Sequence, residues 1–227
     1  MKRLEMTGRT VFLTGGGGGI GREILRCFAE CGANVIAPRS AELDLLSEDA
    51  IRSYFEQLPA SPDILRHAAG INILAGMTEV TPEVMQRVFQ VNVFSFASLI
   101  RYTVPHMTAQ DFGRIIGISS LYGIVSRERR IPYSASKHAM TGLIRSAALE
   151  GAPHNILVNG VAPGYVMTDM TRRNLSPEEI AQLTGQIPTG RLQEAEEIAD
   201  LCLFLCSSMN RSITGQIIPV DGGFICK

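Results

Sequence analysis

Thr14-Gly15-Gly16-Gly17-Gly18-Gly19-Ile20-Gly21 follows the short apolar strand candidate Thr10–Leu13 and leads into a segment with helical spacing of apolar residues, Ile20–Cys31. A phosphate group approaches a backbone closely only where side chains are absent, and a helix N-terminus offers unpaired amides and the positive end of a dipole. The glycines between strand and helix therefore predict a dinucleotide-binding turn. Their spacing is G-x-x-x-G-x-G, which differs from the common G-x-G-x-x-G pattern.

Apolar, β-branched runs alternate with helical segments along the rest of the chain, a pattern typical of a parallel sheet. The further strand candidates are Asn34–Ala37, Ile64–Arg66, Arg114–Ser119, Leu157–Val161 and Gln216–Val220. The further helix candidates are Ser47–Gln57, a long helix from Thr81-Pro82 to about Tyr102, Tyr133–Glu150 and Glu194–Cys206. We expect an α/β fold over residues 1–227: a single doubly wound Rossmann-like domain with a mostly parallel sheet and helices on both faces. Residues 165–191 are too long for a bare connection and form a candidate substrate loop.

Composition excludes several classes of protein. The chain has 227 residues, of which 45% are hydrophobic, and a formal net charge of −1, so it offers no basic field for nucleic acid or for a membrane surface. It has no apolar run long enough to span a bilayer, and the residues through Arg9 contain no signal-peptide core. We expect a cytoplasmic protein. The five cysteines lack metal-ligand spacing and favour no metal site.

Tyr133 and Lys137 are four residues apart on a predicted helix, so they share one face. A tyrosine with a pKa of about 10 is only ~0.1% phenolate at pH 7. Lowering that pKa by three units requires ~4 kcal/mol, which a cation ~4 Å away supplies at an effective dielectric constant of ~20. The pair is a candidate acid–base group, and the alternative is an ordinary tyrosine and lysine on a solvated face.

Ser119-Ser120 ends the strand candidate Arg114–Ser119. Ligands of open parallel sheets gather beyond the carboxyl ends of the strands, where a hydroxyl can hydrogen-bond a substrate oxygen. Serine is also a common turn residue, so this position alone leaves both interpretations open.

Taken together, these motifs resemble the short-chain dehydrogenase/reductase family over essentially the whole chain, with the 3-oxoacyl-[acyl-carrier-protein] reductase branch the most similar. The resemblance implies hydride transfer between a nicotinamide and a carbonyl or carbinol carbon, with Tyr133 exchanging the oxygen-bound proton, Lys137 lowering its pKa and Ser120 orienting the substrate oxygen. Asn92 corresponds to the helix asparagine that helps hold a proton path to the lysine. The catalytic set that the resemblance implies is Asn92, Ser120, Tyr133 and Lys137. The cofactor-binding set is Gly15, Gly19, Ile20, Gly21, Arg39, Asp44, Leu45, Ala69, Gly70, Tyr133, Lys137, Pro163, Gly164, Val166 and Thr168.

The chain departs from the family pattern at two places. His67-Ala68-Ala69-Gly70 stands where the family usually has Asn-Asn-Ala-Gly, and we interpret His67 as structural. The segment Pro38–Leu45 is too short for the helix and strand that the family carries there. The resemblance therefore implies a reduced crossover between strands two and three, with Asp44-Leu45 beside the adenine.

Arg39 lies 18 residues after Gly21, where an acidic residue would specify NAD and an arginine suits the 2′-phosphate of NADP. We expect NADP, with NAD as the alternative because Glu42 is close by and the glycine turn carries no basic residue.

The expected substrate is a carbonyl compound, with a 3-oxoacyl thioester on an acyl carrier protein as one candidate. Arginines could dock such an acidic carrier: Arg127, Arg129, Arg130, Arg172 and Arg173. A sugar, a cyclic diol or another small secondary alcohol is the alternative substrate. A non-catalytic dinucleotide-binding scaffold or sensor and a sugar-nucleotide epimerase are further alternatives. The family's pairing of long helices implies a homotetramer.

Overall fold

The computed structural model describes residues 4–226. The expectation about the first nine residues therefore falls partly outside the described residues. Among the described residues, six strands form one parallel sheet in the order β2-β1-β3-β4-β5-β8. Their bounds are β1 Thr10–Thr14, β2 Asn34–Ile36, β3 Ile64–His67, β4 Gly113–Ile118, β5 Ile156–Pro163 and β8 Ile217–Val220. The predicted parallel α/β sheet is confirmed, with strand ends shifted by at most two residues.

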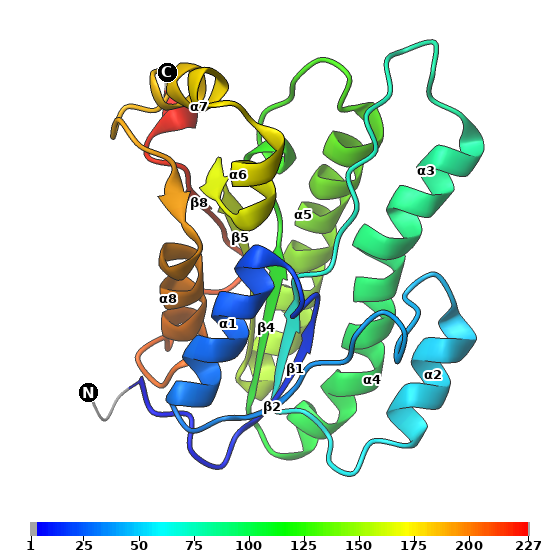
Figure 1. Ribbon diagram of the computed structural model, residues 1–227. Coiled ribbons are helices and arrows are strands. Elements are labelled where there is room, and N and C mark those ends of the chain that lie inside the picture. The colour runs from blue at the N-terminus through cyan, green and yellow to red at the C-terminus, as the bar shows by residue number, and fades with distance from the viewer. Residues whose placement is uncertain (1–3, 227) are drawn as a thin grey trace.

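Helices cover both faces of this sheet, as Figure 1 shows. The helices are α1 Gly19–Glu30, α2 Glu48–Glu56, α3 Pro82–Phe89, α4 Ser95–Ala109, α5 Ile131–Gly151, α6 Asp169–Asn174, α7 Pro177–Thr184 and α8 Ala195–Cys206. None of the helices within residues 4–226 is long and apolar enough to cross a bilayer.

Alternate residues of the strands build two separate cores, because successive side chains of a strand point to opposite faces. On one face, Val11 and Leu13 of β1 pack with Phe28 of α1 and residues of α8. On the other face, Phe12 packs with residues of α4 and α5, including Phe96. The sheet is thus buried on both sides, which fixes where its carboxyl edge lies.

The crossover between β2 and β3 contains α2 as its helix, and β2 forms the edge of the sheet. Ser47 caps α2 by accepting a hydrogen bond from the amide of Ala50, as a serine in this position is expected to do. Residues 38–45 contain neither a helix nor a strand, which confirms the predicted reduced crossover.

The long helix is not uniform. α3 begins at Pro82 behind the capping residue Thr81, continues through a π-helical turn at Gln90–Phe94, and runs on as α4 to Ala109. The predicted end near Tyr102 is wrong. The last turns persist past Pro105, because the fully buried Met107 packs closely on Gly113 at the start of β4.

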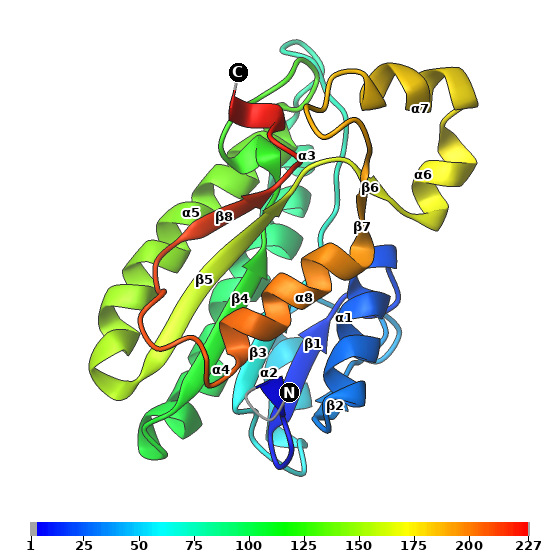
Figure 2. The ribbon, with the colours of Figure 1, turned by 90° about the vertical axis from the view of Figure 1, so that its left-hand side faces the viewer.

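The candidate substrate loop, residues 165–191, is built from α6, α7 and the short strand β6, Val166–Met167. β6 pairs in parallel with β7, Gln193–Glu194. α6 and α7 lie beyond the carboxyl ends of the main strands (Figure 2). The segment therefore stands above the edge where a ligand of this fold is expected.

Candidate active site

The glycine turn is packed too tightly for side chains. A Cβ on Gly21 would lie 2.0 Å from the carbonyl oxygen of Gly15, and a Cβ on Gly19 would lie 2.7 Å from the side chain of Thr168. Gly15 has a φ of +77° and touches the backbone of Ala68 and Ala69. These contacts bring the start of α1 against the end of β3.

The start of α1 is suited to an anion. Gly18 occupies the N-cap position and supplies no side-chain cap, in contrast to Ser47 and Thr81 at α2 and α3. The first amides of a helix need hydrogen-bond acceptors from outside the helix. The uncapped turn therefore fits a phosphate group of a dinucleotide.

A cavity of about 640 Å³ opens beside this turn. It is lined by residues that the sequence assigns to the cofactor, together with neighbours: Gly15, Gly16, Gly17, Gly18, Arg39, Asp44, Leu45, Ala69 and Gly70. Arg39 is exposed and holds Glu42 through its backbone amide at 2.7 Å and its guanidinium at 3.3 Å. These hydrogen bonds lower the pKa of Glu42. The cavity is large enough for part of a dinucleotide, with a cation at its rim.

A second cavity of about 300 Å³ shares Ala68 and Gly70 with the first. Besides these, it brings together residues from four other parts of the chain: Ile20, Ser120, Tyr133, Lys137, Pro163, Gly164, Val166 and Thr168. The sequence-predicted catalytic serine, tyrosine and lysine therefore face one space that adjoins the predicted dinucleotide cavity.

Lys137 is buried, and its Nζ donates a hydrogen bond to the carbonyl of Ile118 at 2.7 Å. Burial lowers the pKa of Lys137 to about 8. Its Nζ lies 5.6 Å from the centre of the Tyr133 ring. The cation is thus fixed beneath the phenol by the end of β4.

Burial raises the pKa of Tyr133, whereas a side-chain hydrogen bond with Ser120 and the charge of Arg130 lower it. The sequence analysis expected Lys137 to lower this pKa to near neutrality. The structure corrects that expectation: the net shift is upward, and the charged group that opposes it is Arg130 rather than Lys137. The ammonium of Lys137 is engaged by the backbone of β4.

Asn92 lies in the π-helical turn and is fully buried. Its Oδ1 accepts from the amide of Ile71 at 2.9 Å, and its Nδ2 donates to the carbonyl of Ile71 and to Oγ of Ser136. The same amide oxygen and the Lys137 Nζ are the groups nearest to a Cβ built on Gly70. Asn92 therefore fixes the segment after β3 against α5, next to the lysine.

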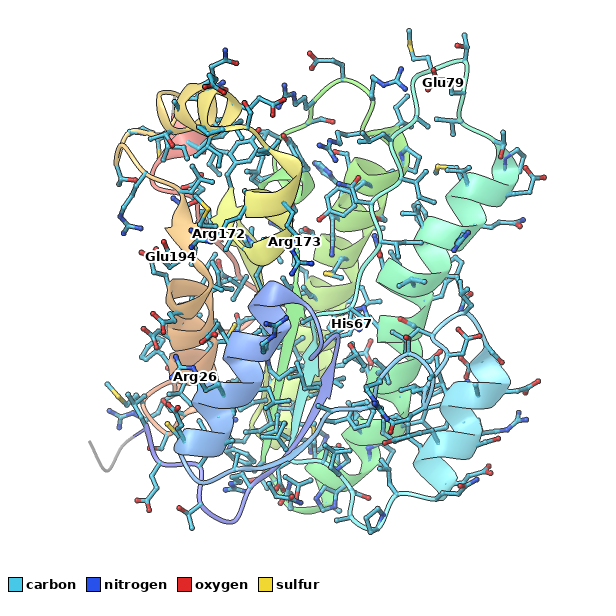
Figure 3. The ribbon with its side chains drawn as sticks, in the orientation of Figure 1. Arg26, His67, Glu79, Arg172, Arg173 and Glu194 are labelled. Carbon is cyan, nitrogen blue, oxygen red and sulfur yellow. The ribbon has the colours of Figure 1, made fainter. Side chains whose placement is uncertain are left out.

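His67 ends β3 and is fully buried (Figure 3). Its Nδ1 lies 2.9 Å from Oγ1 of Thr14, and its ring stacks on Phe96 at 5.0 Å. Burial, helped by the charge of Lys137, lowers the pKa of His67 to about 3. These contacts agree with a structural role, in which the histidine stays neutral.

The candidate docking arginines have different surroundings. Arg129 forms an ion pair with Glu79 at 2.9 Å, and Glu79 lies in the loop before α3 (Figure 3). Arg127 instead donates to the hydroxyl of Tyr165 at 3.2 Å. Arg172 and Arg173 extend from α6 and are exposed (Figure 3). Arg129 is therefore paired with a carboxylate, whereas Arg127 contacts a phenol hydroxyl.

Sequence analysis missed two tyrosines beside the catalytic cavity. The hydroxyls of Tyr122 and Tyr165 lie 2.9 Å apart. Tyr122 comes two residues after Ser120, and Tyr165 directly follows Pro163-Gly164. Their positions next to these two motifs are the sequence signal that could have identified them as residues near the site.

Comparisons with known proteins agree with this geometry. Residues 37–225 match the family described as enoyl-(acyl carrier protein) reductase. The 3-oxoacyl-[acyl-carrier-protein] reductase FabG of Aquifex aeolicus is 34% identical, over 97% of this chain and 98% of the relative. A gluconate 5-dehydrogenase from Burkholderia cenocepacia, solved in complex with NADP and tartrate, is 27% identical with a TM-score of 0.92, over 99% of this chain and 98% of that chain. A putative NAD(P)-dependent gluconate 5-dehydrogenase from Beutenbergia cavernae with bound NADP is 31% identical with the same TM-score, over 99% and 100% of the two chains.

Proposed function

Because the chain belongs to the short-chain dehydrogenase/reductase family and is an oxidoreductase of carbonyl or CH–OH groups, we propose that it uses NADP(H) and that Tyr133 is its acid–base residue. The observation that carries this proposal is the convergence of Ser120, Tyr133 and Lys137 on one cavity that adjoins the glycine-lined one. The nicotinamide, when bound, supplies or accepts the hydride.

The chain's own residues handle the proton and the substrate oxygen. In the direction of reduction, the Tyr133 hydroxyl donates its proton to the oxygen that gains charge as hydride arrives at the carbonyl carbon. The Ser120 hydroxyl donates a hydrogen bond to the same oxygen and stabilises that charge. Lys137, held by Ile118, lies beneath the phenol, and the charge of Arg130 favours the phenolate that remains. In oxidation each step runs in reverse.

The dinucleotide is held by four regions of the chain in this proposal. The uncapped start of α1 takes the pyrophosphate, and Asp44, Leu45, Ala69 and Gly70 enclose the adenosine half. The loop at Val166 and Thr168 meets the carboxamide of the nicotinamide. Arg39 takes the 2′-phosphate, which favours NADP over NAD. The NADP in the two gluconate dehydrogenase structures supports this choice.

Two substrate classes are supported by different comparisons. The FabG relative acts on 3-oxoacyl-[acyl-carrier-protein], which supports a β-keto thioester as substrate and an acyl carrier protein as partner. Two gluconate dehydrogenase structures, each with a TM-score of 0.92, support a polyhydroxy acid or another small secondary alcohol. A homotetramer is part of the same proposal. Phe94, the last residue of the π-helical turn before α4, and Leu149 on α5 are 51% and 79% exposed. They offer apolar surface for pairing these helices, and light scattering measures the mass of the assembly.

The test is a titration with NADPH and NADH, followed by a panel of carbonyl compounds. The panel contains a 3-oxoacyl thioester mimic, a 2-enoyl thioester mimic, 5-ketogluconate and a small cyclic ketone. We expect tighter binding of NADPH than of NADH, and turnover of at least one ketone but not of the enoyl compound. Equal, slow oxidation of both nucleotides with every compound would contradict the proposal and favour a dinucleotide-binding scaffold.

A further inference from the structure

A pair of tyrosine hydroxyls, those of Tyr122 and Tyr165, lies next to residues that line the catalytic cavity. Tyr122 belongs to the short 3-10 helix Leu121–Gly123, whose first turn is capped by the Ser120 hydroxyl. Tyr165 packs edge-on against Phe224 near the C-terminus, and its hydroxyl meets that of Tyr122 at 2.9 Å. Because Ser120 and Gly164 line the catalytic cavity, the two phenols stand directly beside it.

Two arginines flank these phenols. Arg127 Nη1 donates to the Tyr165 hydroxyl at 3.2 Å, and the guanidinium of Arg130 lies 5.5 Å from the centre of the Tyr122 ring. Among residues 4–226, neither arginine forms an ion pair with a carboxylate. Arg129, between them in sequence, differs because it is bound to both carboxylate oxygens of Glu79. The loop therefore places two arginines without a carboxylate partner around this tyrosine pair, Arg127 at the Tyr165 hydroxyl and Arg130 over the Tyr122 ring.

Arg130 is also close to the reacting group. It occupies the N-cap of α5, three residues before Tyr133, and residues three apart at a helix start lie on neighbouring positions of one face. The charge of Arg130 acts on the pKa of the Tyr133 phenol. An anion held by Arg130 would thus lie on the side of the site where Tyr133 holds the substrate oxygen.

We propose that Arg127 and Arg130, together with the hydroxyls of Tyr122 and Tyr165, bind the carboxylate of a small keto acid or hydroxy acid substrate. A guanidinium offers paired donors that match a carboxylate, and phenol hydroxyls supply further donors. Arg130 is half-buried against Tyr122, which suits a small anion better than the surface of an acidic carrier protein. This inference rests on the proposed function, since it names the substrate class of the same site.

The experiment compares a charged substrate with its neutral analogue. Acetoacetate and ethyl acetoacetate present the same ketone with and without a carboxylate, and kcat/KM is measured with NADPH for the wild type, Arg130→Gln, Arg127→Gln and the control Arg129→Gln. We expect the wild type to prefer acetoacetate. We expect the ratio of the two kcat/KM values to fall about 10- to 100-fold in Arg130→Gln and Arg127→Gln, because a charge-assisted contact is lost. The control should keep the ratio.

Arg130→Gln should also shift the pH profile of kcat upward, because one group that lowers the pKa of Tyr133 is removed. That shift affects both substrates alike, so the ratio isolates binding of the carboxylate. An unchanged ratio in both variants, or a wild-type preference for the ester, would overturn the inference and favour a neutral thioester.

A binding measurement tests the proposed carboxylate site separately from turnover. Succinate, which has no ketone to reduce, is titrated into the complex of each variant with NADP. We expect weaker binding, through a raised Kd, in Arg130→Gln and Arg127→Gln and no change in Arg129→Gln. If no ketone is turned over, the proposed function is wrong. If succinate binds all four proteins equally, the proposed carboxylate site is wrong, whatever the outcome of the turnover experiment.

Discussion

The Nζ of Lys137 lies 5.6 Å from the centre of the Tyr133 ring, one helical turn along α5. The ammonium is tied to the Ile118 carbonyl at the end of β4, so the helix carrying the phenol is anchored to the strand that leads directly into Ser120. This link places the proton-handling residues on rigid elements. Catalytic geometry that rests on a strand end and a helix start is less exposed to loop motion.

The glycine turn gives a prediction with a matched control. Gly21→Ala should lower the free energy of unfolding by about 2 kcal/mol, because its Cβ would meet the Gly15 carbonyl oxygen at 2.0 Å and the backbone must shift. Gly17→Ala should leave that free energy unchanged, because a Cβ there meets no atom within 4 Å. Urea denaturation of both variants measures the difference. Equal stability of the two would show that the turn is not packed as described.

Choice of dinucleotide should depend on Arg39. Arg39→Gln should weaken NADPH binding about 10- to 100-fold and leave NADH binding nearly unchanged, because only NADP has the 2′-phosphate that the guanidinium would contact. Glu42→Gln should strengthen NADPH binding, since Glu42 competes for the same guanidinium at 3.3 Å. Fluorescence titration of each variant with both nucleotides is the measurement. A parallel loss for NADPH and NADH in Arg39→Gln would point to a structural role.

His67 should make the protein less stable in acid. The unfolded histidine takes up a proton below about pH 6.5, whereas in the folded chain the pKa of His67 is about 3. The unfolded state therefore binds more protons between these values, and stability is lost as pH falls through that window. Relative to His67→Gln, the wild type should lose about 2 to 3 kcal/mol of unfolding free energy between pH 6.5 and 4.5.

The exposed His154 provides the control for this measurement. His154→Gln should keep the steep acid dependence of the wild type in urea denaturation across the same pH range. If His67→Gln and the wild type lose stability in parallel, His67 is not held neutral inside the fold.

Periodicity and motif context predicted the elements that carry the site. The strand before Gly15 and the helix after it were placed to within a residue, because a short β-branched apolar run and a helical spacing of apolar residues are strong local signals. The resemblance supplied the partnership of Ser120, Tyr133 and Lys137, which no single motif could establish. The structure then brought these residues to one cavity.

Features that depend on tertiary contacts could not be predicted from the sequence. The π-helical turn that directs Asn92 inward has no sequence signature, and the extension past Pro105 depends on packing of Met107 on Gly113. The shift of the Tyr133 pKa depends on burial and on Arg130, neither of which is visible from a spacing of four residues. The sequence likewise could not separate Arg129, paired with Glu79, from Arg127 and Arg130.

The Tyr133→Phe variant tests the central claim most directly, because it removes only the hydroxyl. NADPH affinity and kcat with the best ketone of the panel are measured for this variant and the wild type. We predict unchanged NADPH binding and a kcat about 10²- to 10⁴-fold lower, the contribution of a positioned acid–base group. A variant that binds NADPH and turns over at the wild-type rate would contradict the assignment of Tyr133 as the proton donor.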